Sequence, residues 1–260
     1  HSTDAGYQIL KQGGNAIDAA VAVGFALAVT LPRAGNIGGG GFMLIYSADS
    51  QEVSAIDYRS AAPVAATSEM YLTESGVVRF GHLVNAVPGS VAGLIKAHKE
   101  HGKLSLKEVL RPAIELARKG FPVSYDLNYV LDWGKNSMLA NNASKKKFYN
   151  PKDKPLPVAS ILKQPKLART LKIIANKGDR AFYEGEIADW IVEDSLANGG
   201  LITKGDLANY SAKDRVPIES FYRGYKIVSM PPAASGGIVL LQILNILENF
   251  DLTKSGHNSA

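Results

Sequence analysis

A run of four consecutive glycines, residues 38–41, separates a long apolar segment from two shorter apolar segments with strand character. Glycine has no side chain to pack, and it weakens helices and strands through its backbone entropy. The glycine run (residues 38–41) is therefore expected either to form a turn with a positive φ angle or to present a backbone that another group approaches closely. A structural turn is the simpler interpretation, and a role in shaping the wall of a pocket is the alternative.

The composition indicates a globular protein without a nucleic-acid-binding surface. Of the 260 residues, 46% are hydrophobic, which is enough for a sizeable core. The net charge of +5 comes from 29 basic and 24 acidic residues, an excess too small to indicate nucleic acid as a partner. The lack of cysteine excludes disulfides, thiolate nucleophiles and Cys-ligated metal sites. No repeat or linker-like stretch divides the sequence, so residues 1–260 are predicted to form a single domain.

Neither a membrane span nor a signal peptide is predicted. The most hydrophobic run, residues 16–31, contains Asp18 and is shorter than the roughly 20 residues that cross a bilayer, so it reads as a buried helix. The first residues have neither the basic nor the apolar region of a signal peptide, so we expect any targeting segment to have been removed or to lie outside this chain. The lysines at residues 145–147 are typical of a solvated surface loop rather than a phosphate or membrane site.

Capping signals divide most of the chain into helices. Asn15 with Asp18, and Ser105 with Glu108, have the spacing of capping boxes, in which two residues satisfy free N–H groups at a helix start. The middle third is expected to be largely helical, with the longest surface loop at residues 141–157. The predicted helices cover residues 2–13, 16–31, 68–71, 90–98, 106–120 with a break or kink at Pro112, 125–139, 166–176, 180–196, a short turn from 203, and 235–247.

Two hairpins complete the predicted secondary structure. Residues 42–46 and 53–58 are continuous apolar runs separated by turn signals, and residues 218–230 fold back at Arg223 and Gly224. Continuous rather than alternating hydrophobicity indicates that both faces of the first hairpin are covered. We therefore predict a multilayer α/β sandwich, in which the helix at residues 16–31 covers one side of the hairpin.

No motif for nucleotide, serine-hydrolase or metal chemistry is complete. The patterns G-x-G-x-x-G and G-x-x-x-x-G-K-[ST] do not occur, which argues against nucleotide binding. Ser90 and Ser235 neighbour glycines, but neither lies in G-x-S-x-G. His98 and His101 could share a helix face as metal ligands, but no further ligand accompanies them, so we expect them to face solvent near a helix end. We predict no metal site and no cofactor.

Arg59 is the residue that we expect to bind a substrate. It follows an apolar strand, where a guanidinium is costly to leave unpaired, and its fork matches a carboxylate through two parallel hydrogen bonds. The residues alone leave open a structural ion pair with Asp57 or Glu52 instead.

Several segments together resemble the γ-glutamyltranspeptidase family over essentially the whole chain. They are Gly13-Gly14-Asn15-Ala16-Ile17-Asp18-Ala19-Ala20-Val21-Ala22, residues 34–42, Asp57-Tyr58-Arg59 with Pro63, and Tyr222-Arg223-Gly224-Tyr225 before Met230-Pro231-Pro232. The resemblance implies an N-terminal-nucleophile (Ntn) hydrolase with an αββα core, whose precursor cleaves itself into two subunits. This chain is similar to the larger, N-terminal subunit, so we expect an incomplete sandwich and a chain truncated at both ends.

The resemblance also implies which residues carry the chemistry. In that family the nucleophile is the threonine that begins the small subunit, and its own α-amino group can serve as its base. No threonine of this chain lies in such a motif, so the resemblance implies no catalytic residue here and a small subunit of the same precursor that supplies it. The family arginine that binds the α-carboxylate of the γ-glutamyl group corresponds to Arg59. Two departures from the family pattern leave open the donor and acceptor preference: Ser60 replaces an acidic residue, and Ala233 with Ala234 replaces proline and serine.

The implied activity belongs to the intact protein and not to this chain alone. It is the formation of an acyl-enzyme from a γ-glutamyl donor such as glutathione and transfer of the acyl group to water, an amino acid or a peptide. The resemblance also implies a periplasmic or extracellular location. A glutaryl or cephalosporin acylase of the same fold is the nearest alternative, because its substrate has a carboxylate but needs no α-amino group. A non-catalytic carboxylate-binding or scaffold protein is the alternative from another class.

Overall fold

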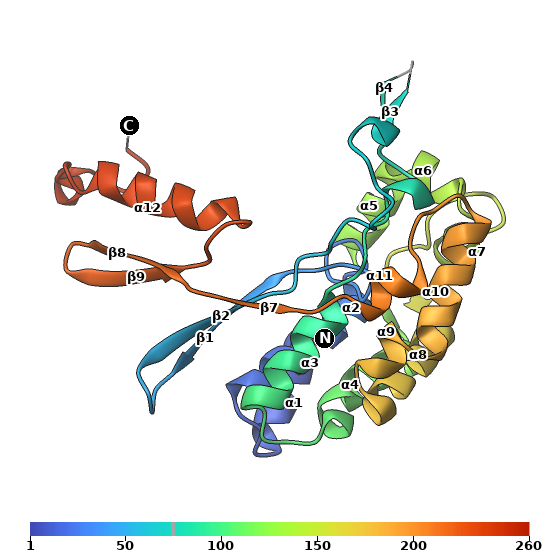
Figure 1. Cartoon of the computed structure of the whole chain (residues 1–260), viewed down its shortest axis with the longest axis horizontal. Coiled ribbons are helices and arrows are strands. Elements are labelled where there is room, and N and C mark those ends of the chain that lie inside the picture. The colour runs from blue at the N-terminus through green and yellow to red at the C-terminus, as the bar shows by residue number, and fades with distance from the viewer. Residues whose placement is uncertain (74–75, 260) are drawn as a thin grey trace.

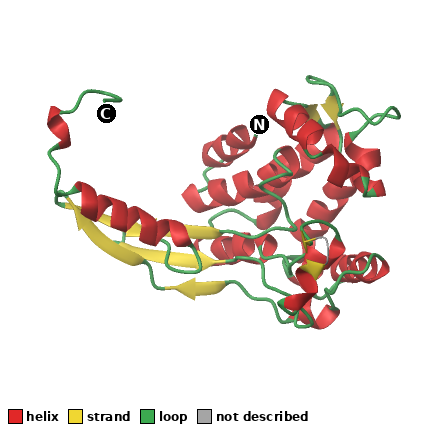
Figure 2. Cartoon of the chain, turned by 90° about the horizontal axis from the view of Figure 1, so that it is seen from above, coloured by secondary structure: helices red, strands yellow, loops and turns green. Residues whose placement is uncertain are grey.

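Most helices gather in one body, and a small sheet connects this body to a projecting arm (Figure 1, Figure 2). The computed structural model describes residues 1–73 and 76–259. The N terminus lies in the helical body, and the C terminus lies at the arm (Figure 1). This mixture of helices and sheet confirms the predicted fold class.

The helical body is built from helices of very different lengths. The α-helices are α1 (Ser2–Lys11), α2 (Ala16–Thr30), α3 (Ser90–His101), α4 (Leu106–Lys119), α5 (Tyr125–Trp133), α6 (Lys135–Leu139), α7 (Asn142–Phe148), α8 (Pro165–Lys177), α9 (Arg180–Tyr183), α10 (Glu186–Ala197), α11 (Lys204–Ala208) and α12 (Ser235–Leu247). Short 3-10 helices are η1 (Glu69–Tyr71), η2 (His82–Val84) and η3 (Leu252–Lys254). The stretch from α5 to α11 confirms the largely helical middle third.

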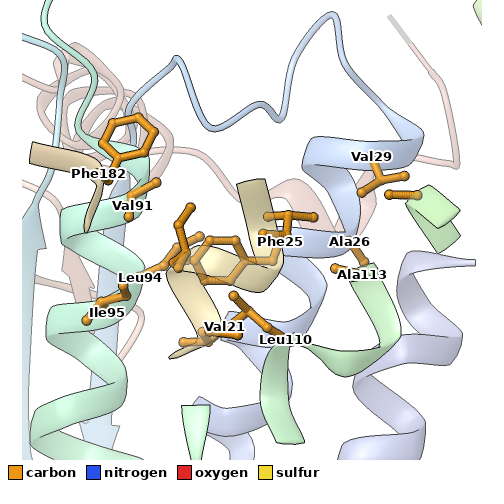
Figure 3. Packing of buried hydrophobic residues seen from close by; sticks show 14 of the residues in the cluster. Val21, Phe25, Ala26, Val29, Val91, Leu94, Ile95, Leu110, Ala113 and Phe182 are labelled. Atoms are coloured by element: carbon orange, nitrogen blue, oxygen red, sulfur yellow. The ribbon is translucent and has the colours of Figure 1, made fainter. Parts of the chain in front are cut away.

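Helix α2 lies at the centre of the body, in contact with α1, α3 and α4. Val21 and Phe25 of α2 are fully buried. Figure 3 shows these two side chains beside Leu94 and Ile95 of α3 and Leu110 of α4. Fully burying a side chain such as valine or phenylalanine stabilises the fold by about 1.5–3 kcal/mol. The apolar character of residues 16–31 therefore reflects a central helix, as the sequence predicts.

A buried carboxylate ties the start of α2 to the loop between α3 and α4. Asp18 is fully buried, and its oxygens accept hydrogen bonds from the backbone N–H groups of Asn15, Lys103 and Leu104 at 3.0–3.2 Å. The Asn15 side chain in turn accepts from the N–H of Asp18, which confirms the predicted capping box. The expectation that His98 faces solvent is wrong. Its side chain is only 11% exposed, and its Nε2 lies 2.8 Å from the Leu104 carbonyl oxygen because the same loop folds over it.

We expect Asp18→Asn to lower the free energy of unfolding by about 2–4 kcal/mol, because hydrogen bonds to charged groups contribute about 1.5–3 kcal/mol each. In asparagine an NH2 group replaces one of the two carboxylate oxygens. This NH2 group cannot accept the backbone N–H hydrogen bonds that the carboxylate oxygen accepts. Thermal unfolding of the purified protein measures the loss. Asp4→Asn is the matched control, because Asp4 lies in the first turn of α1 with its side chain 73% exposed. Equal unfolding temperatures for the two variants would show that the hydrogen bonds to the Asp18 carboxylate do not contribute to stability.

Several predicted helix boundaries are wrong. Helix α4 continues through Pro112, because its packing against α2 and α8 outweighs the lost hydrogen bond. Residues 125–139 divide at Gly134 into α5 and α6, and residues 180–196 divide at Gly185 before α10. The predicted loop at residues 141–157 contains α7, so the three consecutive lysines lie on a helix. A glycine costs about 1 kcal/mol in a helix, which explains both divisions.

The central sheet has three antiparallel strands in the order β1-β2-β7. Strands β1 (Phe42–Ser47) and β2 (Glu52–Asp57) form the predicted first hairpin. Strand β7 (Lys213–Arg215) pairs with β2 and places Lys213 opposite Asp57. The sequence did not predict β7, because its three residues are all charged and exposed. Two small antiparallel pairs are β3 (Leu72–Thr73) with β4 (Gly76–Val77), and β5 (Phe121–Pro122) with β6 (Ile161–Leu162).

The first hairpin is covered less completely than its continuous hydrophobicity predicts. Helix α3 contacts β2, whereas α2, expected to cover the hairpin, packs mainly against α1, α3 and α4. Ala55 and Ile56 of β2 are both buried, although successive side chains point to opposite faces. Leu44 and Tyr46 of β1 are 39% and 63% exposed in this chain. The sheet is therefore enclosed on both faces only toward the Asp57 end of β2.

The projecting arm consists of the second predicted hairpin and α12 (Figure 1). Strands β8 (Ile218–Tyr222) and β9 (Tyr225–Ser229) are joined by a two-residue turn in which Arg223 and Gly224 have φ angles of 49° and 82°. Helix α12 packs against both strands. None of the described helices has the length and apolarity needed to cross a bilayer.

Candidate functional site

Arg59 lies just beyond the end of β2, where its exposed side chain lines an open cavity of about 370 Å³. We call this the Arg59 cavity. Ser60 follows Arg59 in the same wall. Residues much later in the chain complete the lining, among them Asp206, Tyr210, Lys213, Arg215 and Ala233. The cavity therefore combines the end of the first hairpin with the segment that runs from α11 through β7.

The glycine run lies against the backbone of Arg59. A Cβ atom on Gly40 would stand 2.5 Å from the Ser60 nitrogen and 2.6 Å from the Tyr58 carbonyl oxygen. Gly41 and Tyr58 exchange two backbone hydrogen bonds, at 3.0 and 3.2 Å. None of the four glycines has a positive φ angle, so that part of the expectation is wrong. The run begins in a turn, closed by the hydrogen bond from the Gly39 N–H to the Asn36 carbonyl oxygen at 3.2 Å, and Gly40 provides the close backbone approach. The run lies behind the Arg59 backbone and is not part of the cavity wall.

The same run is tied to the start of α3. The Gly39 carbonyl oxygen accepts hydrogen bonds from the N–H groups of Gly89 and Ser90, at 2.7 and 3.0 Å. A Cβ atom on Gly89 would stand 2.0 Å from the Tyr58 carbonyl oxygen. The backbones of the glycine run, Tyr58 and the first turn of α3 therefore pack closely against one another.

Asp57 holds the Arg59 backbone but does not pair with its side chain. Asp57 is buried, and its Oδ1 accepts the Arg59 N–H at 3.0 Å. Its Oδ2 accepts from Nε and Nη2 of Arg215, at 3.0 and 2.9 Å. The ion pairs of Arg59 with Asp57 or Glu52 that the spacing leaves open do not form, since Asp57 is engaged by Arg215 and Glu52 lies at the opposite end of β2. Within residues 1–73 and 76–259, the Arg59 guanidinium has neither a hydrogen bond nor an ion pair.

Tyr210 holds the other side of the Arg59 backbone. Its hydroxyl donates to the Arg59 carbonyl oxygen at 2.8 Å. Its ring stacks on Tyr183, with centroids 5.6 Å apart, and the Tyr183 hydroxyl donates to the Pro88 carbonyl oxygen at 2.8 Å. Burial, with a smaller contribution from the charge of Asp57, raises the pKa of Tyr210 to about 12. The hydroxyl therefore stays protonated near neutral pH and remains a donor to Arg59.

Asp206 is the second acid in the Arg59 cavity, and the backbone engages it. Its Oδ2 accepts from the N–H and hydroxyl of Thr203 at 2.9 and 2.6 Å, which confirms the predicted helix start. Its Oδ1 accepts the Val64 N–H at 2.8 Å, a long-range contact that the sequence did not predict. Asp206 therefore fixes the segment that follows Arg59 and has no cationic partner among the described residues.

The sequence analysis singled out Arg59, which lines the cavity, but not the residues that surround it. Tyr210, Lys213 and Arg215 lie about 150 residues later, and the only local signal was a short charged segment after a predicted helix turn. Ser60 and Ala233, where the sequence departs from the pattern it resembles, both line the Arg59 cavity. Ser90 and Ser235 are absent from this lining.

Comparisons with known proteins agree along the whole chain. The family model described as Gamma-glutamyltranspeptidase matches residues 2–260. The glutathione hydrolase proenzyme of Escherichia coli (strain K12) is 48% identical over 264 residues, which cover 100% of this chain and 45% of the relative. The acylase ACY 1 proenzyme of Pseudomonas sp. (strain SE83) is 43% identical over 267 residues, which cover 98% of this chain and 47% of the relative.

A solved structure gives the same result for the fold. The crystal structure of Helicobacter pylori γ-glutamyltranspeptidase matches with a TM-score of 0.95 at 43% identity, covering 100% of this chain and 75% of that chain. The chain spans about half the length of the curated relatives that it matches. With a family model that covers all but its first residue, the chain belongs to the γ-glutamyltranspeptidase family, a family of enzymes with the Ntn-hydrolase fold.

Proposed function

We propose that residues 1–260 are the large-subunit portion of a longer precursor that transfers or hydrolyses the γ-glutamyl group of glutathione and related compounds. The observation that carries this proposal is the Arg59 guanidinium, which lines an open cavity while its own backbone is fixed on both sides. A relative named glutathione hydrolase proenzyme supports the substrate class and the precursor.

The proposed role of Arg59 is to bind the α-carboxylate of the donor. A guanidinium presents parallel N–H groups that pair with both oxygens of a carboxylate, which fixes orientation as well as position. Asp57 and Tyr210 hold the Arg59 N–H and carbonyl groups, so binding the donor costs little ordering of the backbone. The donor would then lie with its γ-carbonyl directed toward a nucleophile from outside this chain.

The nucleophile in this proposal is a threonine at the start of the small subunit. Its hydroxyl attacks the γ-carbonyl carbon, a covalent acyl-enzyme forms, and the amine of the leaving group departs with a proton. Water, an amino acid or a peptide then accepts the γ-glutamyl group. The small subunit of the same precursor is thus the proposed protein partner, and a periplasmic or extracellular location is proposed from the family resemblance alone.

The test compares the intact protein with residues 1–260 alone. We expect the intact protein to hydrolyse a γ-glutamyl anilide and the isolated chain to show no turnover, because the nucleophile lies elsewhere in the precursor. Circular dichroism of the isolated chain checks that it is helical under the assay conditions. Turnover by the isolated chain would overturn the assignment of the nucleophile, and an inactive intact protein would favour the scaffold alternative.

A second candidate activity is that of a glutaryl or cephalosporin acylase, which the relative named acylase ACY 1 proenzyme favours. Both substrate classes offer a carboxylate to Arg59, so the cavity described above suits both. The same assay with γ-glutamyl and glutaryl donors separates them. Preference for the glutaryl donor would replace the proposed transpeptidase activity by that of an acylase.

A further inference from the structure

Lys213 shares a face of the central sheet with Asp57. The two residues lie directly opposite each other in the antiparallel pairing of β2 and β7, so their side chains point to the same face. Arg215 lies two residues along β7 and therefore also projects to this face. The ion pair of Arg215 with Asp57, at 2.9 Å, agrees with that placement. Lys213 and Arg215 both line the Arg59 cavity.

The cavity has more positive than negative charge. Its lining includes the cations Arg59, Lys213 and Arg215 and the acids Asp57 and Asp206. Asp57 is already engaged by Arg215 and by the Arg59 N–H, while Asp206 is occupied by hydrogen bonds from the backbone and a hydroxyl. For the part of the chain that the structure describes, Lys213 forms no hydrogen bond or ion pair through its side chain, as is also true of Arg59.

We propose that Lys213 binds a second carboxylate of the donor, the one at the far end of its leaving group. This inference rests on the proposed function and names its substrate class: γ-glutamyl peptides with a free C-terminal carboxylate, as in glutathione. The two cations suit different ends of such a ligand. The arginine fork fixes one carboxylate bidentately, whereas a lysine ammonium is a point charge on a flexible stem that can follow a more distant carboxylate.

The expected gain in donor affinity from Lys213 is moderate, because the Lys213 side chain is exposed. Ion pairs at exposed positions are weak and are screened by salt. We therefore expect Lys213 to lower the KM for a donor with a C-terminal carboxylate by about two- to fivefold at low ionic strength. The gain should largely vanish near 1 M salt, where the screening length is about 3 Å.

The test uses two donors that differ only in the charge of interest, glutathione and its C-terminal amide. The intact protein is assayed as wild type, Lys213→Met and Lys172→Met, and kcat and KM are measured for both donors. Lys172 is a matched control, because it is an exposed lysine on α8 and does not line the Arg59 cavity. We expect Lys213→Met to raise the KM for glutathione about two- to fivefold. The KM for the amide and both values in Lys172→Met should stay unchanged.

The outcomes separate this inference from the function on which it rests. If Lys213→Met raises the KM for both donors equally, Lys213 affects binding of the shared γ-glutamyl part or the fold, and the inference is overturned. Equal KM values for the two donors in the wild type would also overturn it. A wild-type enzyme that accepts neither donor would instead refute the proposed function, and the inference with it.

Discussion

Replacing Arg59 by alanine in the intact protein is expected to raise the KM for γ-glutamyl donors by about 100-fold, with a smaller change in kcat. Each hydrogen bond between charged groups contributes about 1.5–3 kcal/mol, and a factor of ten corresponds to about 1.4 kcal/mol. Two such bonds, reduced by the exposure of the Arg59 side chain, give about 3 kcal/mol, hence the hundredfold effect. Initial rates over a range of donor concentrations measure the change.

Arg59→Lys separates the bidentate geometry of the guanidinium from its positive charge, and a second variant serves as a control. Arg59→Lys keeps the positive charge but loses the bidentate geometry, so we expect it to recover only part of the affinity. Arg180→Ala is the control, because its side chain is 81% exposed and, among the residues that the structure describes, its only ion pair is with Glu184, one turn along the chain. An unchanged donor KM in Arg59→Ala would remove Arg59 from the binding site, whatever the stability of the variant.

At the Arg59 cavity, hydrogen bonds hold the Arg59 backbone, while its guanidinium has no hydrogen bond or ion pair to any described residue. The N–H of Arg59 is bonded to Asp57, its carbonyl oxygen to Tyr210, and the glycine run packs against its peptide unit. None of these contacts uses the guanidinium. Such a division is expected of a binding residue, since a preorganised backbone lowers the cost of binding while the unpaired charge remains available to the ligand.

The parts of this arrangement that the sequence predicts are those with local signals. Apolar runs flanking a turn predict the β1–β2 hairpin, and the spacing of Asn15 with Asp18 predicts the start of α2. The glycine run predicts close packing as one of two alternatives. Arg59 follows from its place after an apolar strand, although its free side chain could only be seen in the structure.

The parts that the sequence does not predict depend on contacts between distant segments. Strand β7 has three charged residues and becomes a strand only because β2 offers a free edge about 160 residues earlier. Tyr210 carries no local signal that it will reach the Arg59 carbonyl oxygen. Helix α4 keeps its course through Pro112 because neighbouring helices hold it on both sides. Tertiary packing thus overrides local propensity at these positions.

The second large effect is expected from Gly40→Ala, which we predict to destabilise the protein by about 3 kcal/mol or more and to weaken donor binding as well. The added Cβ would meet the backbone at 2.5–2.6 Å, at the Ser60 nitrogen and the Tyr58 carbonyl oxygen. Overpacking in a closely packed core costs about 1–3 kcal/mol, and backbone atoms yield less readily than side chains. The variant should therefore unfold at a lower temperature than the wild type.

Gly39→Ala is the matched control in the same glycine run. Its Cβ would have ordinary contacts, the nearest at 3.4 Å to the Asn36 carbonyl oxygen, so we expect a change of less than about 1 kcal/mol. Thermal unfolding and donor KM are measured for both variants of the intact protein. If Gly40→Ala moves the Arg59 backbone, its KM should rise even at temperatures where the variant is fully folded. If Gly40→Ala has the same stability and the same donor KM as Gly39→Ala, the close contact at Gly40 does not position Arg59.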